Sequence, residues 1–229
     1  MPGKSQENPF NGKIMPMRIR VTYARSDSIR YTGHLDMQRV WERTLRRSRL
    51  PVAYSQGFNP QARIQIACAL PLGFTSQCEL LDFWLESERP LPEIKLALEN
   101  AVHPGIEVLN LAEVDLPQPA LQTQVIATQY QVTLLDSYAL TDIQLCIQNL
   151  LAESSLCRTW REKLYDLRPL VEILACAESA DGSPMIIMRL SARQNATGRP
   201  EEVLSALGLN PLLARYDRTQ LLLENLSTV

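Results

Sequence analysis

The sequence predicts a mixed α+β fold in which one order of elements occurs twice. Three observations support this prediction. Apolar residues alternate with a period of two in several short segments, they recur at helical spacing in others, and a proline-containing stretch, residues 115–120, separates two regions of similar element order. The 229 residues, 45% hydrophobic and 21% charged, have the composition of a globular protein with room for one large domain or two small ones.

The first half begins with a strand and a helix. Met17–Tyr23 alternates apolar and polar residues, as a strand with one buried face does. From His34 the apolar residues follow helical spacing, and this helix ends before Pro51, which cannot continue it. The remaining elements predicted for this half are strands at Val52–Tyr54, Arg63–Ala69 and Leu80–Leu85, a helix at Leu91–Val102 and a strand at Ile106–Val114.

The second half repeats this order. Its predicted elements are a strand at Tyr130–Leu135, a helix at Thr141–Ala152, strands at Leu170–Ala177 and Met185–Ala192, a helix at Pro200–Leu207 and a strand at Arg215–Leu223. Each half therefore has the β-α-β-β-α-β order of a ferredoxin-like unit, an antiparallel sheet with helices on one face. We expect a tandem of two such units with a cleft between their sheets. The predicted boundaries are a flexible N-terminal lead (1–16), a first half (17–115), a linker (116–126) and a second half (127–229).

Several classes of protein are disfavoured by what the sequence lacks. No apolar run is long enough for a membrane helix, and the first residues have no apolar core typical of a signal peptide, so we expect a soluble cytoplasmic protein with no membrane partner. The five cysteines form no C-x-x-C pair, which predicts free thiols rather than a metal site or a disulfide framework. Phosphate-binding, dinucleotide-binding, zinc and iron–sulfur motifs are absent too, so no cofactor is expected.

Positive charge is concentrated near the N-terminus. Between Arg18 and Arg63 there are ten arginines and three acidic residues, an excess of seven positive charges, so that the rest of the chain carries −9 of a net charge of −2. Such asymmetry indicates an anionic partner, although a solvated basic face would look the same in sequence.

The predicted first helix concentrates this charge further. Arg39, Arg43 and Arg46 or Arg47 share the face opposite the apolar stripe, and guanidinium groups form forked hydrogen bonds with phosphate. The alternative is a helix whose arginines pair with acidic residues of the same chain. Arg30 precedes the helix, and His34 lies in its first turn, where it could act as an acid or base or serve only a structural role.

The segment after this helix is rich in side chains that hydrogen-bond or stack on bases. It contains Tyr54, Ser55, Gln56, Phe58, Asn59 and Arg63. Loops have few structural requirements of their own, so this richness favours a binding function, although Gly57 and Pro60 also suit a plain tight turn. A second basic cluster, which includes Lys163 and Arg168, is weaker evidence of the same kind.

These residues also carry a family resemblance. The motifs, in chain order, are Tyr31–Asp36, Arg43–Pro60, Leu70–Gly73 with Ser76 and Glu79, Asp166–Pro169 and Arg199–Pro200. Over most of residues 17–220 the chain resembles the radical-SAM-linked domain of unknown function, which occurs alone or fused behind a cobalamin-binding radical SAM protein. The resemblance implies such a protein as partner, and the partner would carry the iron–sulfur cluster. The radical SAM portion itself is absent from this sequence.

Three hypotheses follow. The first is a cofactor-free accessory module that binds RNA, such as a tRNA or rRNA element, for modification by a radical SAM partner, with no intrinsic catalysis and no DNA sequence specificity. In this hypothesis the arginines hold phosphates, Phe58 or Tyr54 stacks on a base, and Asn59 or Gln56 reads a base edge. The second is a metal-independent RNA-processing enzyme with His34 as acid or base, and the third is a protein-interaction subunit whose basic half docks on an acidic partner.

Overall fold

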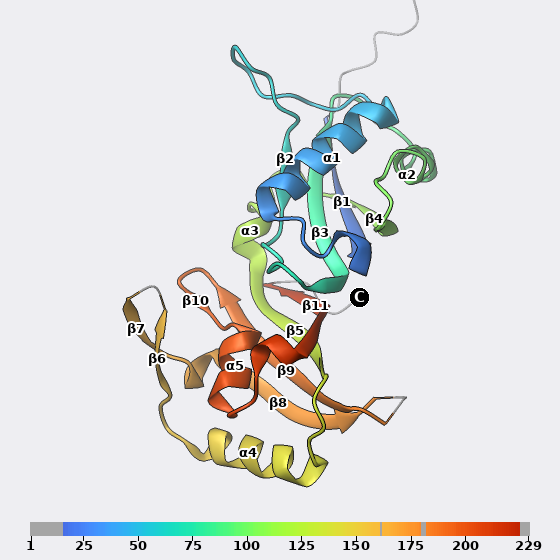
Figure 1. Cartoon of the computed structure of the whole chain (residues 1–229). Helices are drawn as coiled ribbons and strands as arrows, with labels where there is room; N and C mark the ends of the chain where they lie inside the picture. The colour runs from blue at the N-terminus through green and yellow to red at the C-terminus, as the bar shows by residue number, and fades with distance from the viewer. Residues whose placement is uncertain (1–15, 161, 180–181, 225–229) are drawn as a thin grey trace, which may run out of the picture.

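The protein has an α+β architecture built on one large, mostly antiparallel sheet (Figure 1). The computed structural model describes residues 16–160, 162–179 and 182–224. The predicted N-terminal lead, apart from Pro16, lies outside the described residues.

The first half contains four strands and two main helices. In chain order they are β1 (Met17–Arg25), α1 (His34–Ser48), β2 (Ile64–Ile66), β3 (Thr75–Leu85), α2 (Leu91–Glu99) and β4 (Ile106–Val114), with a short 3-10 helix, η1 (Asp27–Ile29), before α1. The strands lie in the order β4-β1-β3-β2, and every neighbouring pair is antiparallel.

The second half has the corresponding elements and several additions. They are α3 (Leu121–Gln124), β5 (Val125–Leu134), α4 (Leu140–Ala152), β6 (Cys157–Trp160), β7 (Lys163–Asp166), η2 (Arg168–Leu170), β8 (Val171–Glu178), β9 (Pro184–Arg193), β10 (Ala196–Thr197), α5 (Pro200–Ala206), η3 (Pro211–Leu213) and β11 (Ala214–Leu223). The order β11-β5-β9-β8 is again antiparallel throughout. The hairpin β6–β7 forms a separate small sheet and was not predicted.

The two halves share one sheet, which differs from the separate sheets and intervening cleft that we predicted. One edge of β3 pairs with β2 through Leu81–Phe83 and with β11 through Thr75 and Ser76. The β3–β11 pair is parallel, and it joins the two sets of strands continuously. Sequence patterns describe each strand alone, so they do not reveal this pairing between strands about 140 residues apart.

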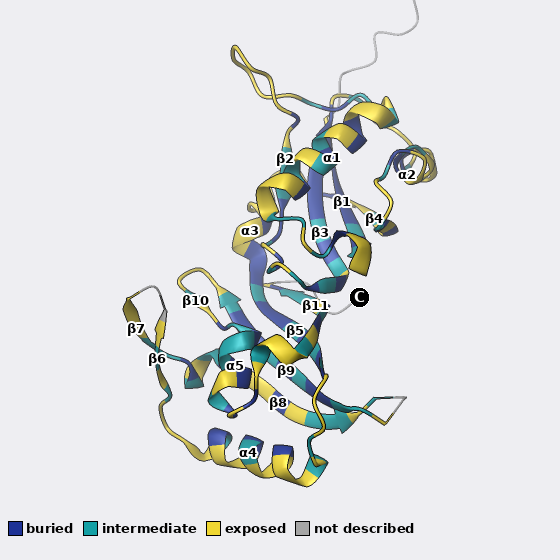
Figure 2. Ribbon diagram, viewed as in Figure 1, coloured by how far each residue is buried: buried dark blue, intermediate teal, exposed yellow. Residues whose placement is uncertain are grey.

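Each half has its own hydrophobic core between the sheet and its helices. In the first core Trp41 of α1 is fully buried. Its ring packs edge to face on the ring of Tyr23 of β1, with 4.8 Å between the ring centroids. In the second core Ile143 and Ile147 of α4 pack among residues of the central strands. Figure 2 shows the outer surfaces of both helices exposed. Burying these apolar stripes is the main force that fixes each helix on the sheet.

The opposite face of the first half is covered by the segment predicted as a linker. Arg18, which alternates with core residues along β1, donates hydrogen bonds to the carbonyl oxygens of Gln118 and Pro119. Leu121 of α3 is fully buried beside Val125. The structure therefore places a helix and the start of β5 within residues 116–126, and this segment packs against the sheet.

Candidate nucleic-acid interface

The ten N-terminal arginines do not form one basic surface. Arg18 and Arg20 are buried and bind the carboxylate of Asp82, with nitrogen–oxygen distances of 2.7 and 2.8 Å. Arg25 is buried as well, and its Nη2 donates to the carbonyl oxygens of Ile29 and Thr32. The positive charge counted in sequence is thus partly neutralised or enclosed. The count over residues 18–63 did not show this, because Asp82 lies 64 positions after Arg18.

The exposed part of the basic segment is the outer face of α1. Met37, Trp41, Thr44 and Leu45 are buried against the sheet, whereas Arg39, Arg43 and Arg46 are exposed on the other side, as the helical spacing predicted. We call these three arginines the α1 ridge. Arg39 forms a 3.1 Å ion pair with Asp36, and the side chains of Arg43 and Arg46 form no hydrogen bond or ion pair with a described residue. Two guanidinium groups are therefore available for an external anion.

Arg47 differs from the ridge. Its Nη2 donates a 2.6 Å hydrogen bond to the carbonyl oxygen of Ala101, just after α2. A cation there satisfies a carbonyl group near a helix C-terminus and joins α1 to the end of α2. Arg47 is exposed and retains other N–H groups, but this contact gives it a structural role that its sequence position did not reveal.

The N-terminus of α1 holds the other predicted residues of this region. Arg30 pairs with Asp27 and lies over the ring of Tyr31, with 4.9 Å from its guanidinium carbon to the ring centroid. His34 is exposed in the first helical turn, and its imidazole makes no hydrogen bond to a described residue. Since a general base is normally held by a hydrogen-bonding partner, the geometry gives His34 no such support.

The loop after α1 is a narrow arm that extends beyond the sheet (Figure 1). The base of the arm is held by the Tyr54–Ala62 bridge and by hydrogen bonds between Ser55 and Gln61 of 2.8 and 3.0 Å. At its tip Phe58 is fully exposed, with 107% relative accessibility. Gln56 and Asn59 are exposed beside it.

Arg63 closes the base of the arm. Its guanidinium carbon lies 4.3 Å from the ring centroid of Trp84, and its backbone amide donates to the carbonyl oxygen of Ala53 at 2.8 Å. Arg18 lies over the same indole at 5.0 Å. The arm is therefore fastened to the end of β3, while the Arg63 side chain remains exposed at the surface.

The structure does not bring Lys163 and Arg168 to this region. Lys163 lies in the β6–β7 hairpin of the second half, away from α1 (Figure 1). Arg168 donates hydrogen bonds to the carbonyl oxygens of Leu151 and Val171, which ties the end of α4 to β8. The sequence alone did not show that these two residues lie apart from the α1 ridge.

Ser76 and Glu79, two residues of the family-resemblance motifs, lie buried on β3 at the junction of the halves. The Glu79 carboxylate accepts a 2.9 Å hydrogen bond from Arg218 of β11, and Arg218 also donates to the Tyr130 hydroxyl and the Ala69 carbonyl oxygen. Burial raises the pKa of the neighbouring Cys68 and Cys78 thiols to about 11 and about 12. This network contains the charged and polar residue types of a functional site, but its position between the halves indicates a structural role.

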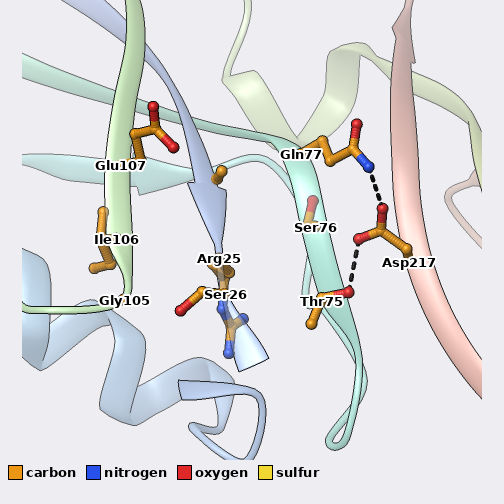
Figure 3. Close-up of a pocket in the computed structure, with 10 residues that line it drawn as sticks. Arg25, Ser26, Thr75, Ser76, Gln77, Gly105, Ile106, Glu107 and Asp217 are labelled. Carbon is orange, nitrogen blue, oxygen red and sulfur yellow. Dashed lines mark hydrogen bonds between the residues drawn. The ribbon is translucent and has the colours of Figure 1, made fainter. Parts of the chain in front are cut away.

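A pocket of about 510 Å³ lies next to this junction (Figure 3). Its lining includes Arg25, Glu107 and Asp217. The Asp217 carboxylate is already held, since it accepts hydrogen bonds from Thr75 and Gln77. The pocket thus carries charges of both signs and is not a basic cleft.

The sequence profile of a bacterial family, described as an uncharacterized protein conserved in bacteria (DUF2344), matches residues 18–200. The chain belongs to this family. The DUF2344 match includes β1, α1, the arm and the junction residues of β3, and it ends at the start of α5. No curated protein matches the chain.

Two further observations concern metals and membranes. Within the described residues of this DUF2344 protein, no group of three or more His, Cys, Asp or Glu side chains is arranged to hold a metal ion. No helix in the same residues is long and apolar enough to span a bilayer.

Proposed function

We propose that this protein is a cofactor-free accessory module that binds RNA through the α1 ridge and the arm. The observation that carries the proposal is the pair of exposed arginines, Arg43 and Arg46, which have no partner within the described chain. The fold does not need them, because the opposite face of α1 supplies its contacts with the sheet. Exposed arginines that can contact phosphates without being freed from an internal ion pair suit a nucleic-acid backbone.

The finer fold assignment belongs to the same proposal. We propose that each half is a ferredoxin-like unit and the chain a tandem of two. The support is the strand order, β4-β1-β3-β2 in the first half and β11-β5-β9-β8 in the second, together with the β-α-β-β-α-β sequence of main elements.

A cobalamin-binding radical SAM protein is the proposed partner, and RNA modification the proposed process. The support is the motif resemblance described above. In this arrangement the partner performs the chemistry and the present chain positions the RNA, such as a tRNA or rRNA element. An acid–base role for His34 is not included, because its imidazole has no orienting partner among the described residues.

The test is RNA binding by the full chain, measured by fluorescence anisotropy with a labelled RNA over a series of salt concentrations. Arg43→Glu with Arg46→Glu should weaken binding at least about tenfold, and each lost phosphate contact should reduce the slope of log affinity against log salt by about 0.7 to 0.9. Arg215→Glu, compared with Arg43→Glu alone, is the control for an equal change of charge, since Arg215 is exposed on β11 of the second half and has no ion pair with a described residue.

The outcomes separate clearly. A folded Arg43→Glu/Arg46→Glu variant that binds RNA as well as Arg215→Glu would contradict the proposal. Circular dichroism and a denaturation midpoint close to that of the unmodified protein establish that the variant is folded.

A further inference from the structure

The arm suggests which form of RNA the ridge would bind. Phe58 exposes its whole ring at the tip, whereas the other three phenylalanines of the chain are Phe10, outside the described residues, and the buried Phe74 and Phe83. Exposing a large aromatic ring to water forgoes the free energy of burying it. A phenylalanine in this position contributes nothing to the core, so its ring is available to an external partner.

The arm holds this ring on an ordered base. The backbone amide of Ala53 donates to the carbonyl oxygen of Trp84 at 2.8 Å, and the backbone amide of Arg63 donates to the carbonyl oxygen of Ala53 at the same distance. Both sides of the arm are therefore hydrogen-bonded close to the end of β3. Gly57, beside Phe58, has a φ of +143°, a backbone conformation that glycine adopts without strain. An anchored loop loses less conformational freedom on binding than a free one.

The ring is also close in sequence to cationic groups. α1 ends at Ser48, the arm base begins at Tyr54, and both lie at the same end of the first half (Figure 1). Arg49 in the connection is exposed, as is Arg63 on the returning side. Phe58 is thus flanked by arginines in sequence, and an exposed aromatic ring combined with arginines on one surface suits unpaired nucleotides, since bases stack on the ring while phosphates meet the guanidinium groups.

We infer that the ridge and arm bind unpaired RNA, with one base stacked on Phe58, in preference to an RNA duplex. The inference rests on the proposed function. In a duplex each base is covered by its neighbours, and opening the stack to admit a phenyl ring costs a few kcal/mol. The deep, narrow major groove of an RNA helix also excludes side chains. A single strand or a loop offers base faces without these costs.

The experiment compares two probes with the same full-length protein. One is a labelled, unstructured RNA of about 12 nucleotides, and the other is the same strand annealed to its complement. The unmodified protein should bind the single strand at least about fivefold more tightly than the duplex. Phe58→Leu should weaken single-strand binding by about fivefold to a hundredfold and leave duplex binding unchanged, since one base–aromatic stack contributes about 1 to 3 kcal/mol.

Two further variants assign the effect to the aromatic ring. Phe58→Trp should retain the preference for the single strand, because an indole also stacks on bases. Leu212→Ala is the control for loss of an exposed apolar side chain, as Leu212 is 88% exposed in the second half. The Leu212→Ala variant should bind both probes as the unmodified protein does.

The failure of this inference differs from the failure of the proposed function. Equal affinity for both probes, with no effect of Phe58→Leu but a large loss in Arg43→Glu/Arg46→Glu, would overturn the preference for unpaired RNA and leave the RNA-binding ridge intact. Absence of binding to either probe would overturn both.

Discussion

The helices α1 and α4 occupy equivalent places in the two halves, yet their outer faces differ in charge. Each helix follows the first strand of its half and buries an apolar stripe against the sheet, Met37, Trp41 and Leu45 in α1 and Ile143, Ile147 and Leu150 in α4. The outer face of α1 carries the ridge arginines. The helix α4 contains no basic residue, and its exposed side chains include Gln144 and Gln148.

This difference separates what the fold requires from what it does not. Both helices are fixed by their buried stripes, so neither needs a charged outer face for packing. The arginines of α1 are consequently an addition to a working structural element, and α4, which contains no basic residue, shows what that element looks like without them.

The largest expected effect on stability comes from disrupting the junction of β3 and β11, which joins the two halves in one sheet. Glu79→Ala should lower the free energy of unfolding by about 3 to 5 kcal/mol, because it leaves the buried Arg218 guanidinium without its carboxylate. Denaturation in urea measures the loss. Glu172→Ala, which removes an ion pair at a more exposed site with Arg193, should cost less than about 1 kcal/mol, and equal losses in the two variants would contradict a structural role for the junction.

Thiol reactivity compares the halves in another way. Burial raises the pKa of Cys68 to about 11 and of Cys78 to about 12, whereas Cys157 in the β6–β7 hairpin is exposed. At about pH 8 a thiol reagent should therefore modify Cys157 at least about a hundred times faster than either first-half cysteine, since the thiolate is the reactive form. Mass spectrometry of the modified peptides over time measures the rates. Similar rates at Cys78 and Cys157 would show that the junction opens readily.

A substitution in the ridge tests directly whether the α1 arginines are surplus to folding. The triple variant Arg39→Gln, Arg43→Gln and Arg46→Gln removes the ridge charges from α1 and leaves glutamines there, the residue type that α4 exposes at Gln144 and Gln148. Its free energy of unfolding should change by no more than about 0.5 kcal/mol, because surface substitutions of this kind have small effects. RNA affinity should fall at least about tenfold.

The same test has a reciprocal control on the other helix. Gln144→Arg with Gln148→Arg places two arginines one turn apart on α4 and should leave stability similarly unchanged. If the α1 variant instead unfolded at markedly lower urea concentration, the ridge would be part of the structural framework.

The smallest effect concerns acid stability at the β6–β7 hairpin. The backbone amides of Leu156 and Arg168 donate to the Asp166 carboxylate at 2.7 and 3.0 Å, and these bonds lower its pKa. A carboxyl group whose pKa is lower in the folded state stabilises that state above its ordinary pKa of 3.8, and the contribution is lost as pH falls through the lowered value. The stability difference between the unmodified protein and Asp166→Asn should shrink between about pH 5 and pH 2. Urea titrations at several pH values measure it, and a pH-independent difference would contradict this role.

Sequence patterns predicted the elements whose structure depends on residues close together in the chain. The helix α1 was expected from His34 to a point before Pro51 and ends at Ser48, because its apolar stripe and the following proline are both visible in sequence. The exposed side of α1 followed from the same stripe. The segment of the arm was likewise expected to be a loop, and the structure adds that its tip is exposed.

Long-range pairing accounts for what sequence patterns missed. The charge count could not show that Arg18 and Arg20 meet Asp82, nor that Glu79 lies opposite Arg218 across the junction. The strand β3 begins at Thr75, earlier than the predicted Leu80, because its first residues pair with β11 and β1. Each of these contacts depends on residues that meet only in the folded chain.

The shared edge of β3 implies that neither half is a self-sufficient building block. If the chain were cut after Gln124, the first half would lose β11 from the edge of β3, and the Glu79 carboxylate would lose its buried guanidinium partner. Unpaired backbone groups at a strand edge are a template for pairing with another chain. Fragments made separately would be prone to associate through this edge, and mixing the two fragments should restore the continuous sheet by complementation.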